Sequence, residues 1–389
     1  MDNKVIKKLS EFGEGFKHHH QDYSAAAISA IRETGGVWEL GGLSFHFPEH
    51  FGFCYGVDKA IDLVFETCQR FSTRIFLTDQ LIHNPTINSK LREKGVEYLK
   101  RDGEKLLVCD GLKREDVVVV SAFGTDFRDI LRLKEKGVTI VDSTCGAIIN
   151  VWKRVEGYAK NGFITVMHGK RDHEETRATL SQAIKEGGAY LAIENSAEAH
   201  ELAEVISGKR PERDFVHAHP GCMISQESVF DVATCKMGMA NQTTMLKEES
   251  LEIQNILRNA FIQRFGEEQT RDRFRSFDTI CGATQDRQDA LKNLLKKPLD
   301  LLLVVGGFNS SNTTHLAEIA QGCLPFFHIE SLQDILSANE ICSHDPQSAR
   351  VSVRQGWLPR GVKNIGITSG ASTPDVTLFE IIQKIVTFY

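Results

Sequence analysis

Short apolar segments that alternate with helical stretches are the feature that most constrains the fold of this chain. The segments are rich in Val, Ile and Leu, and each has the length of a strand. Strands that helices cover on both faces have continuously apolar sequences, whereas half-exposed strands alternate. The pattern therefore predicts an α/β fold with mainly parallel sheets. The segments span residues 73–79, 116–123, 138–144, 162–168, 189–193 and 299–307.

The composition excludes several classes of protein. A chain of 389 residues with 41% hydrophobic and 25% charged residues is neither disordered nor collagen-like. Its longest apolar run, residues 299–307, is far shorter than the ~18 residues of a membrane span, and its start lacks the apolar region of a secretion signal. With a formal charge of −6 and no long basic run, we expect no nucleic-acid or membrane partner and a cytoplasmic location.

Three cysteines lie where a strand or turn gives way to a helix. They are Cys54, Cys145 and Cys281, and the last two lie in the related sequences DSTCGA and DTICGA. The chain has nine cysteines and no Cys-x-x-Cys pair, which argues against a secreted disulfide framework and against a local zinc or redox motif. We therefore predict three α/β units whose thiols meet at a pseudo-threefold centre. The expected boundaries are an N-terminal extension of residues 1–42 and units of residues 43–144, 145–279 and 280–389, the last with a C-terminal segment.

The residues alone leave the chemistry of these three thiols open. Each lies next to Gly or near a helix start, where backbone amides and the helix dipole favour a thiolate. Three thiolates suit either a zinc ion with a water molecule or a cubane iron–sulfur cluster whose fourth iron is open. The alternative is structural burial, which is our interpretation for Cys68, Cys109, Cys323 and Cys342.

Two loops that follow predicted strands contain histidines. His83 precedes Pro85, which favours a loop at that point, and His173 and Glu175 follow the predicted strand at residues 162–168. Glu175 is a proton donor if burial raises its pKa, and otherwise a solvated carboxylate at a helix start. The histidine triplet at residues 18–20 lies in the polar extension, and we interpret it as surface.

Hydroxyl and amide side chains gather in residues 241–245, 306–315 and 366–375. The second cluster follows the most apolar predicted strand and precedes a helix, and the third repeats this arrangement. Backbone amides and Ser or Asn donors at such a turn suit a phosphate group. Helix N-capping alone explains either turn taken singly. Together with the two histidine loops, the turns indicate a small anionic, phosphorylated ligand.

Eight motifs occur in this order along the chain: GFCYGVDKAID, LIHNPTIN, DSTC, HGKRDHEET, NQTTM, TICGATQDRQ, GGFNSSNT and GITSGASTPD. In these motifs the chain resembles the 4-hydroxy-3-methylbut-2-enyl diphosphate reductase family, also called LytB or IspH. The resemblance covers nearly the whole chain and is similar to the plant and cyanobacterial branch, which has an N-terminal extension. It implies a cloverleaf of three α/β units around a central cavity.

The resemblance also implies a role for each matching residue. Glu175 would deliver protons, and Thr243 would hydrogen-bond the substrate hydroxyl. Cys54, Cys145 and Cys281 would ligate a [4Fe-4S] cluster with an open fourth iron. The residues that bind the diphosphate would be His83, His173, Ser310, Ser311, Asn312 and Ser372.

The implied reaction is a two-electron reductive dehydroxylation, the last step of the methylerythritol phosphate route to isoprenoids. Its substrate, 4-hydroxy-3-methylbut-2-enyl diphosphate, would yield isopentenyl and dimethylallyl diphosphate. The expected electron donor is ferredoxin or flavodoxin. The expected location is the cytoplasm, or the plastid stroma if the chain comes from a photosynthetic eukaryote.

Two positions depart from the family's pattern. Phe123 stands where many bacterial members have a histidine, which removes one diphosphate donor. Gly146 follows Cys145 where the family usually has proline, which alters the loop that holds the cysteine. Two competing hypotheses remain, namely a zinc hydrolase that uses the same thiolates and a non-catalytic cluster protein such as a sensor.

Overall fold

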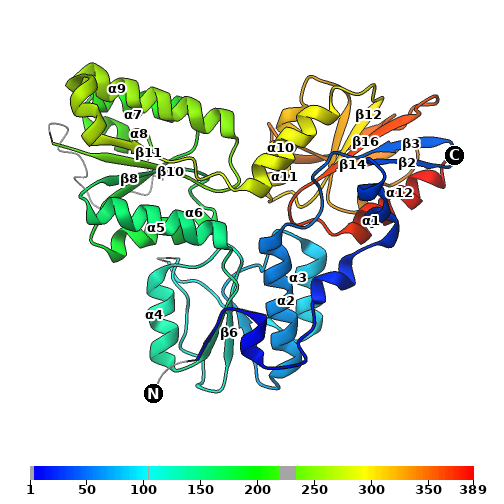
Figure 1. The fold of residues 1–389 in the computed structure, drawn as a ribbon, viewed down its shortest axis with the longest axis horizontal. Coiled ribbons are helices and arrows are strands. Elements are labelled where there is room, and N and C mark those ends of the chain that lie inside the picture. The colour runs from blue at the N-terminus through cyan, green and yellow to red at the C-terminus, as the bar shows by residue number, and fades with distance from the viewer. Residues whose placement is uncertain (1–3, 104, 220–233) are drawn as a thin grey trace. The chain divides into compact units, whose positions relative to one another are not determined.

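Parallel sheets covered by helices make up the computed structural model, which describes residues 4–103, 105–219 and 234–389 (Figure 1). The chain divides into two compact units. The first unit comprises residues 1–7, 71–79 and 96–281, and the second comprises residues 8–70, 80–95 and 282–389. None of the helices in the described residues is both long and apolar enough to cross a membrane.

One order of four parallel strands occurs three times among the described residues. Two of the sheets lie in the first unit and the third lies in the second unit. The sequence therefore indicated the α/β class and a threefold repetition correctly at the level of the strands. The three orders are β7-β6-β4-β5, β11-β10-β8-β9 and β3-β16-β12-β13, and every neighbouring pair in them is parallel.

The first sheet has a fully apolar strand at its centre. All four residues of β6 are valines and all are buried, as expected for a strand covered on both faces. Helix α4 begins at its cap Asp126, whose carboxylate accepts the N–H of Arg128, and it ends at Gly137. The elements are β4 (Ile75–Leu77), β5 (Glu97–Tyr98), β6 (Val117–Val120), β7 (Thr139–Asp142) and α4 (Phe127–Lys136), and β1 (Val5–Ile6) adds an edge strand beside β7.

The second sheet has helices on both faces. Figure 1 shows α5 and α6 on one face and α7 and α9 on the other. Gly238 lets α5 approach, because a Cβ there would lie 2.4 Å from the ring of Tyr158, whose hydroxyl donates to the carbonyl of Met239. The strands are β8 (Ile164–His168), β9 (Tyr190–Ile193), β10 (Met237–Asn241) and β11 (Phe274–Ser276). The helices are α5 (Gly146–Lys160), α6 (Glu174–Lys185), α7 (Ser196–Ile206), α8 (Glu212–Ala218) and α9 (Lys247–Arg273).

The third sheet forms the core of the second unit. Helices α1 and α12 pack on one face of it, and α10 and α11 pack on the other. The strands are β2 (Val37–Leu40), β3 (Leu43–His46), β12 (Leu301–Val305), β13 (Phe326–Ile329), β14 (Glu340–Asp345), β15 (Arg350–Gln355) and β16 (Asn364–Ser369). The helices are α1 (Ala26–Glu33), α2 (Tyr55–Arg70), α3 (Pro85–Glu93), α10 (Gly282–Leu294), α11 (Ser311–Ala320) and α12 (Asp375–Val386), with 3-10 turns at Leu9–Phe12, His19–Tyr23 and Leu332–Asp334.

The sheets group some segments differently from the expected boundaries. Strand β3, expected in the unit of residues 43–144, pairs in parallel with β16, and β2 from the expected extension pairs with β3. Buried Leu43 and Phe45 of β3 join the core of the third sheet. An apolar segment predicts a strand but does not specify which strand pairs with it, because parallel neighbours are often distant in sequence.

Candidate active site

The three cysteines occupy equivalent positions in the three sheets. Each follows the first strand of its four-strand order, and each backbone N–H donates to a carbonyl two residues beyond the end of the neighbouring parallel strand. This repetition explains why a cysteine recurs at a strand-to-helix transition. The hydrogen bonds run from Cys145 to Ala122 at 3.0 Å, from Cys281 to Thr243 at 3.0 Å and from Cys54 to Ala371 at 3.1 Å.

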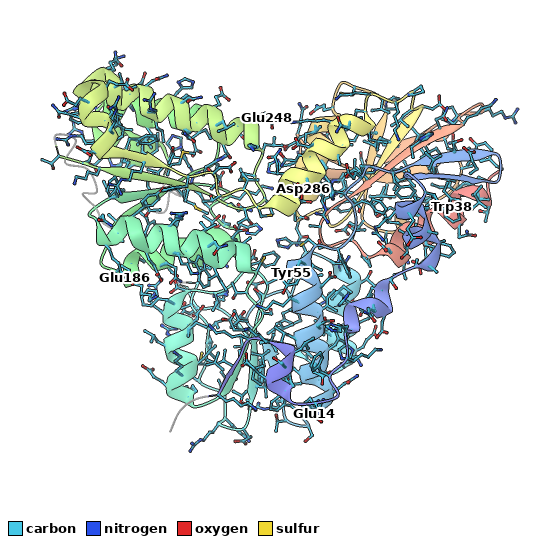
Figure 2. The ribbon with its side chains drawn as sticks, viewed as in Figure 1. Glu14, Trp38, Tyr55, Glu186, Glu248 and Asp286 are labelled. Atoms are coloured by element: carbon cyan, nitrogen blue, oxygen red, sulfur yellow. The ribbon has the colours of Figure 1, made fainter. Side chains whose placement is uncertain are left out.

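Each of these cysteines directly precedes a helix. Cys145 is the N-cap residue of α5, and Cys54 and Cys281 are followed by the first residues of α2 and α10. All three are half-buried cysteines that form no disulfide. Tyr55, the first residue of α2, is exposed and is labelled in Figure 2. A helix N-terminus stabilises negative charge, and the carboxyl end of a parallel sheet is where ligands bind, so the surroundings suit thiolate ligands.

A buried carboxyl group lies beside the NQTTM loop in the first unit. Glu175, the second residue of α6, is 1% exposed. The N–H of Thr243 donates to its Oε1 at 2.6 Å, and the Thr243 hydroxyl donates to its Oε2 at 3.0 Å. Burial raises the pKa of Glu175 to about 7, although the two hydrogen bonds from Thr243 act in the opposite direction. The sequence left open whether Glu175 is a buried acid or a solvated carboxylate at a helix start. The structure shows the buried acid, with a pKa suited to proton transfer at neutral pH.

His173 caps the same helix. Its Nδ1 accepts the N–H of Glu175 at 3.1 Å, and the Phe123 ring lies edge-on to the imidazole with 5.4 Å between ring centres. Because Nδ1 accepts a hydrogen bond, the proton of the neutral imidazole is on Nε2. The neutral His173 ring is therefore a hydrogen-bond donor through Nε2 and an acceptor through Nδ1.

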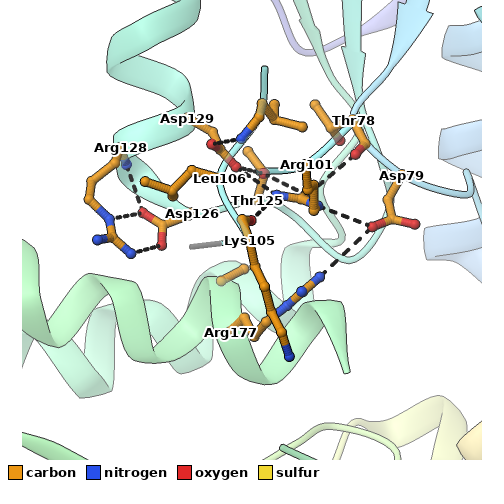
Figure 3. A network of polar contacts seen from close by, with 12 residues as sticks. Thr78, Asp79, Arg101, Lys105, Leu106, Thr125, Asp126, Arg128, Asp129 and Arg177 are labelled. Atoms are coloured by element: carbon orange, nitrogen blue, oxygen red, sulfur yellow. Dashed lines mark hydrogen bonds and ion pairs between the residues drawn. The ribbon is translucent and has the colours of Figure 1, made fainter. Parts of the chain in front are cut away.

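Ion pairs attach α6 to the first sheet. Figure 3 shows Arg101 between the buried carboxylate of Asp129, at 3.0 Å, and the half-buried carboxylate of Asp79, at 3.6 Å. Arg177 of α6 also reaches Asp79, at 3.9 Å. Helix α5 adds a hydrogen bond from the Trp152 ring N–H to a threonine of α6. The position of Glu175 is therefore fixed by contacts on both sides of its helix.

Three loops pack together in the second unit. The Ser372 hydroxyl donates to the His83 carbonyl at 3.0 Å, and the Asn84 amide donates to the Ser372 carbonyl at 2.9 Å. Asn84 also caps α3 by accepting the N–H of Ile87. Gly307 allows the third loop to approach, since a Cβ there would lie 2.6 Å from the His83 carbonyl. The sequence drew attention to His83 but assigned no role to Asn84, which holds the loops together.

The turn that begins α11 is tied to the loop beside Cys54. Ser310 caps the helix by accepting the N–H of Thr313. Buried Asn312 accepts the N–H of Ala371 at 3.1 Å and donates to Thr284 at 3.3 Å. Ala371 also accepts the Cys54 N–H, so the turn and the cysteine loop share a residue.

Two buried histidines support this turn from behind. His328 hydrogen-bonds the Gly306 carbonyl through Nε2 at 3.0 Å, and its Nδ1 lies 3.3 Å from Nδ1 of His344. Burial lowers the pKa of His328 to about 4, so it is neutral near pH 7. A carbonyl only accepts, so Nε2 of His328 has the proton and Nδ1 of His344 donates to the bare Nδ1. The Phe308 ring stacks on His344.

Residues 46–386 match the family model described as LytB protein. The chain belongs to the LytB family. Curated relatives named 4-hydroxy-3-methylbut-2-enyl diphosphate reductase are 40% identical in Acaryochloris marina and 41% identical in Thermosynechococcus vestitus. Both alignments cover 99% of this chain, and they cover 97% and 98% of the relatives respectively. The resemblance inferred from the eight motifs is thereby confirmed.

Two solved structures share the fold of this LytB-family chain. One is an (E)-4-hydroxy-3-methyl-but-2-enyl diphosphate reductase described as the terminal enzyme of the non-mevalonate pathway, with a TM-score of 0.54 at 24% identity over 88% of this chain and 98% of that one. The other is an E-1-hydroxy-2-methyl-but-2-enyl-4-diphosphate reductase from Plasmodium falciparum, with a TM-score of 0.62 at 22% identity over 87% and 86%.

Membership in the LytB family implies an iron–sulfur cluster, and the donor set of this chain fits one. Cys54, Cys145 and Cys281 are half-buried and form no disulfide, whereas Cys109 is buried as expected for a structural residue. Cys68 and Cys342 are only half-buried, and Cys323 is exposed at the end of α11. The prediction that these last three are buried is therefore wrong. Cys68 lies in the last turn of α2 and Cys323 follows α11, where a small side chain need not face the core, and Cys342 lies in β14, next to the edge strand β15.

Other sequence-based interpretations have mixed outcomes. His19 of the triplet is buried and hydrogen-bonds Glu66, so the triplet is not simply surface. Gly146, the departure from the LytB pattern, has a negative φ, and nothing lies within 4 Å of a Cβ added there. Sterics therefore do not require glycine at that position. Cys222, one of the nine cysteines, lies outside the described residues.

Proposed function

We propose that this chain reduces 4-hydroxy-3-methylbut-2-enyl diphosphate to isopentenyl and dimethylallyl diphosphate in the last step of the methylerythritol phosphate route. The names of relatives that align over nearly the whole chain support this substrate. The observation that carries the proposal is Glu175, a fully buried acid with a pKa of about 7 that is hydrogen-bonded to Thr243. Reductive loss of a hydroxyl group as water needs such a proton donor.

In this proposal Cys54, Cys145 and Cys281 ligate a [4Fe-4S] cluster through three of its irons. When bound, the cluster supplies two electrons in single steps and an open iron that is a Lewis acid toward the hydroxyl oxygen of the substrate. The three equivalent hydrogen bonds of the cysteine N–H groups support a common role for the thiols. The competing zinc hydrolase would use the same thiolates but would need no redox centre.

Glu175 and Thr243 form a proton path. The Thr243 N–H holds Oε1 as an acceptor, so the proton of the neutral acid is on Oε2, which faces the Thr243 hydroxyl. When Glu175 is ionised, the Thr243 hydroxyl donates to Oε2. When Oε2 takes a proton, this hydrogen bond reverses, so that the hydroxyl accepts from Oε2 and donates its own proton to the leaving oxygen. Two electrons and two protons convert the alcohol to the alkene and water, and the two products differ in the carbon that takes the second proton.

The diphosphate is bound by neutral donors at helix starts. In this proposal His173, with its ring proton on Nε2, binds as a hydrogen-bond donor, and α11 adds the amides of its first turn. The side chains that we assign to this role are His83, His173, Ser310, Ser311, Asn312 and Ser372. Ferredoxin or flavodoxin is the proposed electron donor. The cysteines of the described residues form no disulfide, which supports a reducing compartment such as the cytoplasm.

Anaerobic purification tests the proposal directly. We expect a brown protein with about four irons and four sulfides per chain. It should consume the diphosphate substrate when a one-electron reductant is present.

Cys145→Ser should lose most of the iron and all turnover, whereas Cys323→Ser, at an exposed thiol, should keep both. A colourless protein with one zinc and no sulfide after reconstitution would support the hydrolase instead. A complete cluster without turnover would support the sensor hypothesis.

A further inference from the structure

Two histidines near the N-terminus lie against a buried aspartate of α2 in the second unit. Nδ1 of His18 is 2.9 Å from Oδ2 of Asp62, and Nδ1 of His20 is 2.9 Å from both carboxylate oxygens. The three candidate ligand atoms lie within 4.8 Å of one another. Asp62 is 4% exposed, whereas His18 is about half exposed, so the cluster opens to solvent on one side.

The neighbouring residues hold the two imidazoles in place. The His20 N–H donates to Oδ1 of Asp62 at 2.9 Å. Between the two histidines, buried His19 contacts Glu66 of α2 at 3.2 Å. Glu66 lies one turn after Asp62, so both carboxylates face the same segment. Residues 18–20 therefore contact α2 through several hydrogen bonds, which fix the positions of the two imidazoles.

The donor set matches a particular class of cation. Two imidazole nitrogens and one carboxylate are ligands that Zn²⁺ and other late first-row divalent ions prefer. Without an ion, each Nδ1 must have a proton to donate to the carboxylate. When a divalent cation binds at Nδ1, the proton of each neutral imidazole moves through solvent to Nε2, and the three protein ligands leave positions open for water or another ligand.

A second carboxylate lies close to the cluster. Asp58 is one turn before Asp62 on α2. Burial raises the pKa of Asp58, the positive charge of His20 lowers it, and the charge of Asp62 raises it further. Asp58 and Asp62 therefore place two carboxyl groups on the same face of α2, beside the two imidazoles.

We propose that His18, His20 and Asp62 form a binding site for a divalent transition-metal ion, with Zn²⁺ the best-matched ion. The site is independent of the thiols, because its donors are nitrogen and oxygen. A bound ion links the N-terminal segment to α2, the helix that directly follows Cys54. The site therefore ties the extension to the element that carries one of the proposed cluster ligands.

Zinc binding to the full-length protein with its iron–sulfur centre tests the proposal. Equilibrium dialysis at micromolar Zn²⁺ should add one zinc per chain, and absorption spectroscopy at the zinc edge should show only nitrogen and oxygen neighbours. Asp62→Asn and the double variant His18→Gln/His20→Gln should bind at least about tenfold more weakly. His217→Gln, at an exposed histidine of the first unit, is the matched control and should bind normally. Mg²⁺ should not compete, since it prefers oxygen ligands.

Several outcomes would overturn the site. They are the absence of zinc beyond the level of the Asp62→Asn variant, sulfur in the zinc coordination sphere, and unchanged affinity in the double variant. Should Asp62→Asn fail to fold, His18→Gln alone at its exposed position gives the same comparison. In that variant the increase in Tm that zinc causes in the wild type should be smaller, since binding only to the folded state stabilises it.

Discussion

The loops that follow the third strand of two sheets, β8 and β12, share a backbone plan but differ in what is buried beside them. In both, a capped helix begins directly after the loop, at His173 in the first unit and at Ser310 in the second. Beside the first lies an acid with a pKa of about 7, and behind the second lies a histidine with a pKa of about 4. The repeated strand order thus places a similar turn before each helix. The buried group beside the turn determines its role, which is proton transfer beside His173 and structural support behind Ser310.

The largest expected effect is a loss of turnover on substitution of the acid beside the first loop. Glu175→Gln keeps the size of the side chain and a hydrogen-bonding group but removes the acid, so turnover should fall by about 10²- to 10⁴-fold. Iron content should not change. Glu174→Gln, at the adjacent half-buried residue, is the control and should stay close to wild type in a steady-state assay. If Glu175→Gln retains full turnover, the proton path through this residue is wrong.

The same contrast predicts opposite effects of pH on stability. Because the pKa of Glu175 is raised, the folded state binds more protons than the unfolded state between pH 4.5 and about 7. The contribution of Glu175 to the free energy of unfolding is therefore lost as pH rises through this range. The lowered pKa of His328 means the reverse, so stability falls as pH decreases from 6.5 to about 4. Each contribution is about 3 kcal/mol, and the two largely cancel in the wild type.

Denaturant unfolding at several pH values tests this cancellation. In Glu175→Gln only the contribution of His328 should remain, so that the free energy of unfolding increases with pH between about 4 and 6.5. His328→Gln, whose amide still donates toward Gly306, should unmask the acid and reverse the slope. Parallel pH profiles for the two variants would contradict the assignments of buried charge.

A smaller effect is expected where the two histidines support the α11 turn. His344→Leu leaves Nδ1 of His328 without its donor, which should cost about 1–3 kcal/mol in the free energy of unfolding. Because the turn is proposed to bind the diphosphate, KM should rise more than kcat falls. His344→Asn places a donor near the same point and should restore part of both values. A variant that changed kcat alone would place this pair in the chemical step.

The smallest effect is expected at Gly146. As the first residue of α5 with open space around it, this position should accept the proline that the family usually has. Gly146→Pro should raise the free energy of unfolding by up to about 1 kcal/mol, because proline restricts the unfolded chain. Thermal unfolding measures the change in stability, and iron content shows whether the cluster is retained. A loss of the cluster would show that the loop of Cys145 needs the flexibility of glycine.

The sequence allowed the strands, the strand-to-helix turns and the three special cysteines to be predicted, because each depends on a local pattern. It did not reveal that β3 pairs with β16, since strand pairing is a non-local property. His328 and His344 lie in strands without a motif, and only the fold brings them behind Gly306. The site of His18, His20 and Asp62 was missed for the same reason, because its third member lies on a distant helix.

The split third sheet has a consequence for how the chain acquires its structure. The strands of the first two sheets have all been synthesised by residue 276, so these sheets are able to form while the ribosome is still adding residues. Strand β3 is made early, yet its parallel partner arrives only with residues 364–366. Until then Leu43 and Phe45 lack their core, and the early segment needs protection from aggregation. The second unit is therefore the last part of a nascent chain to fold, and truncation near the C-terminus should affect residues close to the N-terminus first.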